Sequence, residues 1–169
     1  MHPRDVQELF EYLIESRPKF LDSFRWLGWD EFAKDRGASW GSMLAIFLHL
    51  LDDEEGWLQY AARGRSLIDA PDRKKEDYSS FEHVAADSTR VGAQTRSFLA
   101  SLTQTELTTE VEFQLPNETM RRTRETIAMH AFVDELAHVG EFVCLLWQLD
   151  VKPPFLDWLD NHVGARTMG

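Results

Sequence analysis

The chain has 169 residues, of which 43% are hydrophobic and 28% are charged. These proportions are ordinary for a globular protein, and the length suits one domain, which we expect to span residues 1–169. The formal net charge is −11, from 18 Lys and Arg against 29 Asp and Glu. Such a chain repels nucleic-acid phosphates, so nucleic-acid binding is disfavoured.

Cys144 is the only cysteine, which excludes a disulfide framework and a thiolate metal cluster. Its neighbours predict a buried helical position.

The N-terminal segment and the apolar runs argue against export and membrane insertion. The first ten residues, MHPRDVQELF, include charged residues where a signal peptide needs an apolar run. The longest apolar run, residues 43–51, is short and contains His49, so no membrane-spanning segment is predicted. We therefore expect a soluble, cytoplasmic protein.

A first long helix is predicted over residues 5–28, where apolar residues keep helical spacing. Asp5 and Glu8 have the spacing of a capping box, which marks the expected start. Pro18 lies inside this segment and predicts a kink or a restart, because proline removes a helical hydrogen bond.

A second long helix is predicted over residues 39–64, with Ser39 as its N-cap and Gly64 as its end. His49 points inward in this helix, among small and aromatic residues. Residues 65–78 contain a proline and the charge run DRKKED, which indicate a long solvated connection.

The third helix is predicted over residues 79–102, since Ser79 and Glu82 again have capping-box spacing. Its expected buried positions recur at helical intervals and are Val84, Ser88, Val91, Thr95, Phe98 and Leu102.

Residues 109–120 change to the alternating pattern of strands, around a Pro-Asn turn, and predict a short β-hairpin. Thr123 is the expected N-cap of the last long helix, which Pro153 and Pro154 prevent from continuing. A short terminal helix is predicted to pack on the body through Phe155, Trp158 and Leu159. The predicted fold class is therefore all-α: a four-helix bundle with a long connection between helices two and three and a hairpin before the last long helix.

The last long helix carries four polar residues inside an otherwise apolar pattern: His130, Asp134, His138 and Glu141. At about 100° per residue they fall on one side of the helix, together with the expected core positions Ile127, Ala137 and Leu145. Because buried polar groups need partners, this cluster predicts either a metal site or a hydrogen-bond network between helices.

Spacing along the helix divides the cluster. Asp134 is one turn from both His130 and His138, but the two histidines are about 12 Å apart along the axis. One ion therefore takes Asp134 and one of the two histidines, with His49 from the second helix as third ligand. Asp53, one turn beyond His49, is expected either to ligate or to orient the His49 ring, while the rest of the acidic run 52–55 is expected to be solvated.

Two imidazoles and one carboxylate with open positions suit zinc and ferrous iron, and are also compatible with nickel and manganese. A dinuclear carboxylate centre is the weaker alternative, although Glu135 and His138 form one ExxH. That centre needs a second ExxH, which no predicted helix supplies.

Two segments resemble the DinB-like (YfiT-like) family of four-helix-bundle proteins. SWGSMLAIFLHLLDDEEGWL is similar to the family's second helix, and AMHAFVDELAHVGEFVCLLWQLD is similar to its last long helix, with the pattern HxxxHxxxHRGQ. The hairpin and the PPFLDWL tail fit as well. The resemblance implies a metal site at His49, Asp134 and His138, where the family usually has three histidines. This sequence departs from the family pattern at two positions. Asp134 stands where the family usually has His, and Glu141 stands where it often has Gln.

The same resemblance implies metal-dependent transferases and isomerases that use low-molecular-weight thiols such as bacillithiol or mycothiol, and it implies homodimers. Our leading hypothesis is a thiol-dependent S-transferase or a hydrolase with a mononuclear divalent metal, in which His130 and Glu141 are the candidate acid/base residues. The alternative is a non-enzymatic dimeric binding or stress-associated protein whose metal site has drifted.

Overall fold

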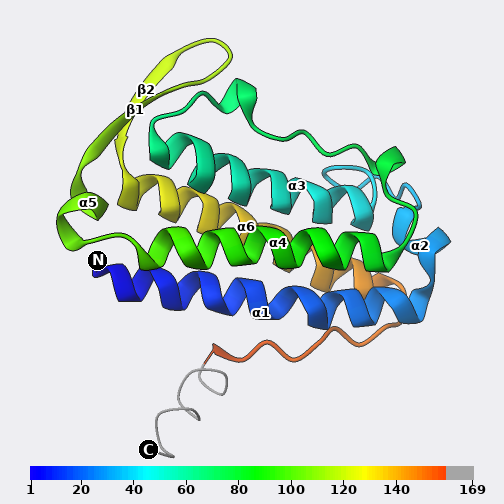
Figure 1. Ribbon diagram of the computed structural model, residues 1–169. Coiled ribbons are helices and arrows are strands. Elements are labelled where there is room, and N and C mark those ends of the chain that lie inside the picture. The colour runs from blue at the N-terminus through cyan, green and yellow to red at the C-terminus, as the bar shows by residue number, and fades with distance from the viewer. Residues whose placement is uncertain (159–169) are drawn as a thin grey trace, which may run out of the picture.

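The computed structural model describes residues 1–158 and is mostly helical (Figure 1). Within these residues there are six α-helices and one two-stranded antiparallel sheet. The elements are α1 (Pro3–Leu27), α2 (Trp29–Ala33), α3 (Met43–Glu55), α4 (Phe81–Ala100), α5 (Gln104–Thr108), β1 (Glu110–Gln114), β2 (Thr119–Thr123) and α6 (Arg124–Gln148). The predicted helical fold with a hairpin before the last long helix is confirmed, with two short helices in addition.

The four longer helices lie side by side, with α1 packed against α4 and α6, and α3 packed against the same two helices (Figure 1). The hairpin and α5 lie at one end of this body and α2 at the other. Near the α2 end, Phe24 packs against Phe32 at 4.9 Å and Phe142 at 5.1 Å, joining three helices through buried rings. None of the described helices is long and apolar enough to cross a membrane.

Helix α1 begins earlier than predicted and runs through its proline. His2 is the N-cap and Asp5 completes the capping box, so the predicted box at Asp5 and Glu8 is wrong by one turn. Pro18 lies inside α1 and does not restart it. The buried residues that follow it, Phe20 among them, hold the second half of the helix against the core, which outweighs the lost hydrogen bond.

Helix α3 is capped by Ser42, not by Ser39, because the chain first makes a turn through Gly41 at φ 86°. The predicted end at Gly64 is confirmed, although the chain reaches it through a π-helical turn (Gly56–Tyr60) and a 3₁₀ turn (Ala61–Arg63). Gly64 adopts φ 71°, the left-handed conformation that ends many helices.

The connection between α3 and α4 is fixed by a residue that we expected to be solvated. The Arg73 side chain is only 6% exposed and pairs with Asp52 at 2.6 Å, Glu55 at 2.5 Å and Asp87 at 2.6 Å. Arg73 therefore ties this connection to α3 and α4, while the other residues of the charge run are exposed, as predicted.

The remaining predicted boundaries are close to the observed ones. Helix α4 is capped by Ser80, one residue later than predicted, and the predicted stripe is buried except for Leu102, which is partly buried. Thr123 is the N-cap of α6, as predicted. On α6, Ile127 and Leu145 are buried, whereas Ala137 and Cys144 are exposed, so both expectations of burial were wrong.

The predicted terminal helix is absent from residues 151–157. Phe155 is 71% exposed, so it does not pack on the body as predicted. The Trp158 ring does, because it packs edge-to-face on Tyr12 with ring centroids 5.3 Å apart. Leu159 lies outside the described residues.

Candidate metal centre

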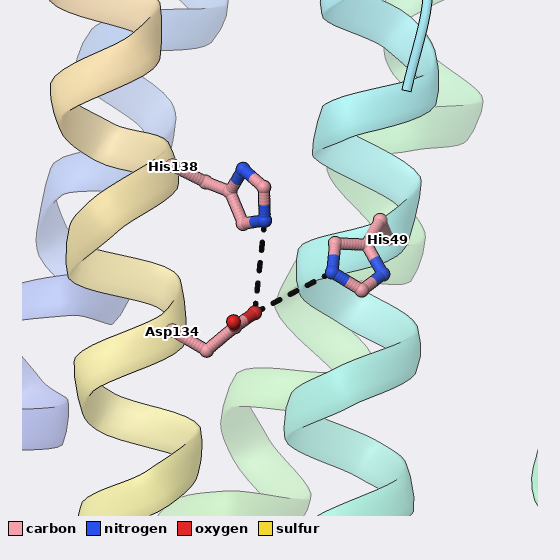
Figure 2. Close-up of side chains that lie close together, drawn as sticks. All are labelled: His49, Asp134 and His138. Carbon is pink, nitrogen blue, oxygen red and sulfur yellow. Dashed lines mark ion pairs between the residues drawn. The ribbon is translucent and has the colours of Figure 1, made fainter. Parts of the chain in front are cut away.

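Three of the predicted ligands meet between α3 and α6 (Figure 2). His49 Nε2 lies 3.4 Å from Asp134 Oδ2, and His138 Nε2 lies 3.7 Å from the same oxygen. One ligand atom from each residue falls within 4.8 Å of the other two. Asp134 and His138 are one turn apart, so both project from the same face of α6 toward α3. The arrangement allows all three to contact one ion.

The oxygen at the centre of this group is a buried atom of Asp134. Asp134 Oδ2 is buried and has no hydrogen-bond partner among the described residues. Leaving a buried carboxylate oxygen unpaired is costly, and native structures rarely do so. A divalent cation bound by the two imidazole nitrogens would also satisfy this oxygen, so the residues present fit a metal.

The electrostatic surroundings also favour a cation. Burial lowers the pKa of His49, which keeps its ring neutral and able to donate a lone pair. Burial and the adjacent Asp134 carboxylate raise the pKa of Asp53 to about 8. Two carboxyl groups therefore share this space with neutral imidazole rather than with a fixed cation.

Asp53 lies near His49, as expected, but does not form a close hydrogen bond with it. Asp53 Oδ1 and His49 Nδ1 are 3.8 Å apart. The stronger contact with His49 comes from Trp40, whose ring stacks on the imidazole with centroids 4.1 Å apart. Trp40 therefore fixes the ring plane of His49.

Glu141 positions His138 from behind. Its Oε2 is 3.0 Å from His138 Nδ1 and accepts a hydrogen bond from the Ser39 hydroxyl at 2.7 Å, while its Oε1 accepts one from the Ser39 amide at 2.9 Å. Burial opposes ionisation of Glu141, but the Ser39 hydrogen bonds lower its pKa overall. Since a carboxylate only accepts, Nδ1 carries the proton and Nε2 presents its lone pair to the centre. Ser39, which we predicted to be a helix cap, holds this carboxylate instead.

His130 is not part of the centre. Its ring is exposed and packs edge-to-face on Trp57 at 4.6 Å, one turn along α6 from Asp134. Between the two histidines that compete for Asp134, the geometry therefore selects His138.

Sequence reasoning missed a second charged cluster in the core. Arg17 donates to both oxygens of Glu135, at 2.9 and 2.7 Å, and also bonds Glu54, which accepts from Thr95 at 2.6 Å. Glu54 is 1% exposed and Glu55 is 6% exposed, so the prediction that most of the acidic run 52–55 is solvated was wrong. The available signal was Arg17, because an arginine on the buried side of a helix predicts an acidic partner in the core.

A cavity lies beside His49. It has a volume of about 450 Å³ and is lined by His49, Asp53, Trp40 and the connection around residues 71–76. One of the three candidate ligands thus lines a space large enough for a small molecule.

Comparison with known proteins identifies the fold. The sequence matches the model of the DinB family over residues 2–168. A crystal structure of a DinB-like protein from Bacillus subtilis is similar, with a TM-score of 0.62 and 13% identity, covering 88% of this chain and 96% of that one. No curated protein matches the sequence. Because the family match covers nearly the whole chain, this protein belongs to the DinB family.

Proposed function

We propose that α1, α3, α4 and α6 form a DinB-type four-helix bundle that holds one divalent metal ion at His49, Asp134 and His138. We propose further that it acts as a thiol-dependent S-transferase or a hydrolase. The observation that carries the proposal is the buried Asp134 Oδ2, which lacks a hydrogen-bond partner among the described residues and faces two imidazole nitrogens. Zinc, nickel, iron and manganese all accept such ligands.

A bound ion would lower the pKa of a coordinated thiol or water and so supply the nucleophile. The chain's own residues divide the remaining work. Glu141 and Trp40 hold the two imidazole rings in place. Asp53 lines the cavity beside His49, so it is the carboxyl group placed to exchange a proton with a reactant there. It replaces His130 and Glu141, which point elsewhere, as the acid/base candidate.

The substrate in this proposal is a small molecule combined with a low-molecular-weight thiol. The 450 Å³ cavity beside His49 could hold part of such a pair of reactants. The remaining part would extend through its open side into solvent. A reaction that consumes a reduced thiol belongs in the cytoplasm, where thiols are kept reduced.

The second candidate function is a non-enzymatic dimeric binding protein, and one surface favours a dimer under either function. Helix α6 presents Val133, Leu136 and Trp147 at 58%, 42% and 59% exposure. Ala137, Gly140 and Cys144 are exposed on the same helical stripe. Small residues among large apolar ones would let the helices of two copies approach closely, so we propose a homodimer through α6.

The first test is metal content and metal-dependent stability. Protein purified without chelator should contain about one equivalent of a transition metal. Adding Zn²⁺ or Ni²⁺ to metal-free protein should raise the melting temperature by about 5–10 °C when the metal is about 100-fold above its Kd. His138→Ala should abolish this rise, and Asp134→His, which restores three histidines, should keep it.

His130→Ala is the matched control, because it removes a histidine from the same helix without touching the centre. It should keep the full rise. Metal-free protein that gains no stability from any of the four metals would refute the metal site and leave the binding-protein function. Metal-loaded protein should then be assayed with a panel of thiols and electrophiles, where His138→Ala should lose turnover and His130→Ala should keep it.

A further inference from the structure

A second, smaller cavity lies between the hairpin and the first turns of α6. Its volume is about 250 Å³, and its apolar walls are Trp57, Phe113, Met120 and Ile127. His130 contributes a ring and Arg122 the single permanent charge. A cavity of this size, walled mainly by rings and aliphatic side chains, suits a flat molecule of one or two rings.

The position of Trp57 creates the cavity. The chain adopts a π-helical turn at Gly56–Tyr60, directly after α3, and Trp57 belongs to it. π-helical turns are rare overall, and many of those known lie at functional sites. The Trp57 ring meets Phe113 at 6.0 Å and His130 at 4.6 Å, both nearly perpendicular, so it forms a fixed wall.

Arg122 is placed on the apolar face of the hairpin. In the β-sheet register, Arg122 is paired with Val111 and Met120 with Phe113. Since alternate residues share a face, these four side chains lie on the face that borders the cavity. A cation on such a face needs an anionic partner or exposure to water, and Arg122 is exposed.

The two adjacent arginines of this hairpin differ in their partners. Arg121, on the opposite face, pairs with Glu110 at 3.4 Å. The Arg122 guanidinium bonds only the Arg121 main-chain oxygen, at 2.7 Å, and meets no carboxylate within ion-pair distance in the part of the chain that the structure describes. In a chain with net charge −11, an arginine without a carboxylate beside an aromatic cavity is a ready site for an anion.

We propose that this cavity binds a small aromatic carboxylate, with its rings between Trp57, Phe113 and Ile127 and its carboxylate on Arg122. The cavity neighbours the candidate metal centre, because Trp57 follows Asp53 by one turn and His130 is one turn from Asp134. An occupant would therefore lie beside the cavity lined by His49. The proposal itself needs no metal and stands apart from the proposed function.

The test is calorimetric titration of the metal-free full-length chain with 2-naphthoate. Saturable binding is expected, and Arg122→Gln should weaken it about tenfold, since a charge-assisted hydrogen bond is lost. Arg121→Gln is the matched control and should change the Kd less than twofold. The neutral analogue 2-naphthalenemethanol should bind wild type and Arg122→Gln alike.

A second variant tests the apolar part of the site. Thr126 is exposed and lines the cavity, so Thr126→Trp should fill it and abolish binding without disturbing the core. Absence of saturable binding to folded wild type overturns the proposal, as does an equal loss in Arg121→Gln and Arg122→Gln. Binding that requires added Zn²⁺ and disappears in His138→Ala also overturns it, because the carboxylate would then be a metal ligand.

Discussion

Two acidic pairs on facing helices have opposite fates. Asp53 and Glu54 are consecutive on α3, and Asp134 and Glu135 are consecutive on α6. One residue turns a helix by about 100°, so each pair is split between two environments. The glutamates enter the core and meet Arg17, whereas the aspartates face the histidines and the open cavity.

The difference between the two clusters is the cation. In the core, burial raises the pKa of Glu135, and Arg17 supplies the positive charge between the two glutamates. Around His49, the described residues supply no arginine or lysine at ion-pair distance from Asp134. The core glutamates have a cation within the chain, whereas Asp134 has none at ion-pair distance among the described residues. Local charge balance thus separates a structural network from a candidate metal site on the same two helices.

The largest effect should come from removing the core cation. Arg17→Met leaves two buried carboxyl groups without a counter-ion and should cost about 3–5 kcal/mol of unfolding free energy, measured by urea denaturation. The triple variant with Glu54→Gln and Glu135→Gln should recover most of this loss, because no unpaired charge remains. A loss below about 1 kcal/mol in Arg17→Met would mean that the core cluster is not a fixed ion network.

A smaller effect should appear in the pH dependence of the metal-free protein. Burial and Asp134 raise the pKa of Asp53 from 3.8 to about 8. The contribution of Asp53 to the free energy of unfolding is therefore most favourable below pH 3.8, and it is lost as the pH rises through about 8. Asp53→Asn should therefore gain stability relative to wild type between pH 5 and pH 8, by about 1 kcal/mol or more.

This comparison isolates Asp53, because Glu135 titrates in the same direction in both proteins. Urea denaturation at the two pH values measures the difference. Parallel stability curves for wild type and Asp53→Asn would show that the two aspartates do not share a restricted space. Saturating Zn²⁺ should abolish the difference in wild type if a cation neutralises the pair.

The grouping of His49, Asp134 and His138 could be predicted from the sequence, because it depends largely on local geometry. Helical spacing places Asp134 one turn from His138, and the family resemblance supplies His49. The core cluster could not be predicted in the same way, because it joins Arg17 to Glu135 across 118 residues. A one-residue difference in helix phase decides whether an acid is buried or solvated, which is why the expectation for Glu54 and Glu55 was wrong.

The same limit explains Ser39. A serine before an apolar helical run predicts an N-cap, and Ser42 in fact takes that role three residues later. Nothing local in the sequence indicates that Ser39 contacts Glu141, 102 residues away. The long-range contacts that orient His138 therefore became visible only in the structure.

The smallest effect should come from this serine. Ser39→Ala removes one of its two hydrogen bonds to Glu141, while the amide bond remains, so His138 is oriented less firmly. We expect Zn²⁺ affinity to fall about twofold to fivefold, and about tenfold or more in Glu141→Ala, since partners of ligating histidines typically matter to that extent. Competition with a chromophoric chelator measures both. Ser42→Ala is the matched control: it should lose about 1 kcal/mol of stability as a helix cap and keep its Zn²⁺ affinity. If the two serine variants instead change affinity equally, the Ser39–Glu141 contact does not act on the centre, and the difference between the two clusters rests on Asp134 and the histidines alone.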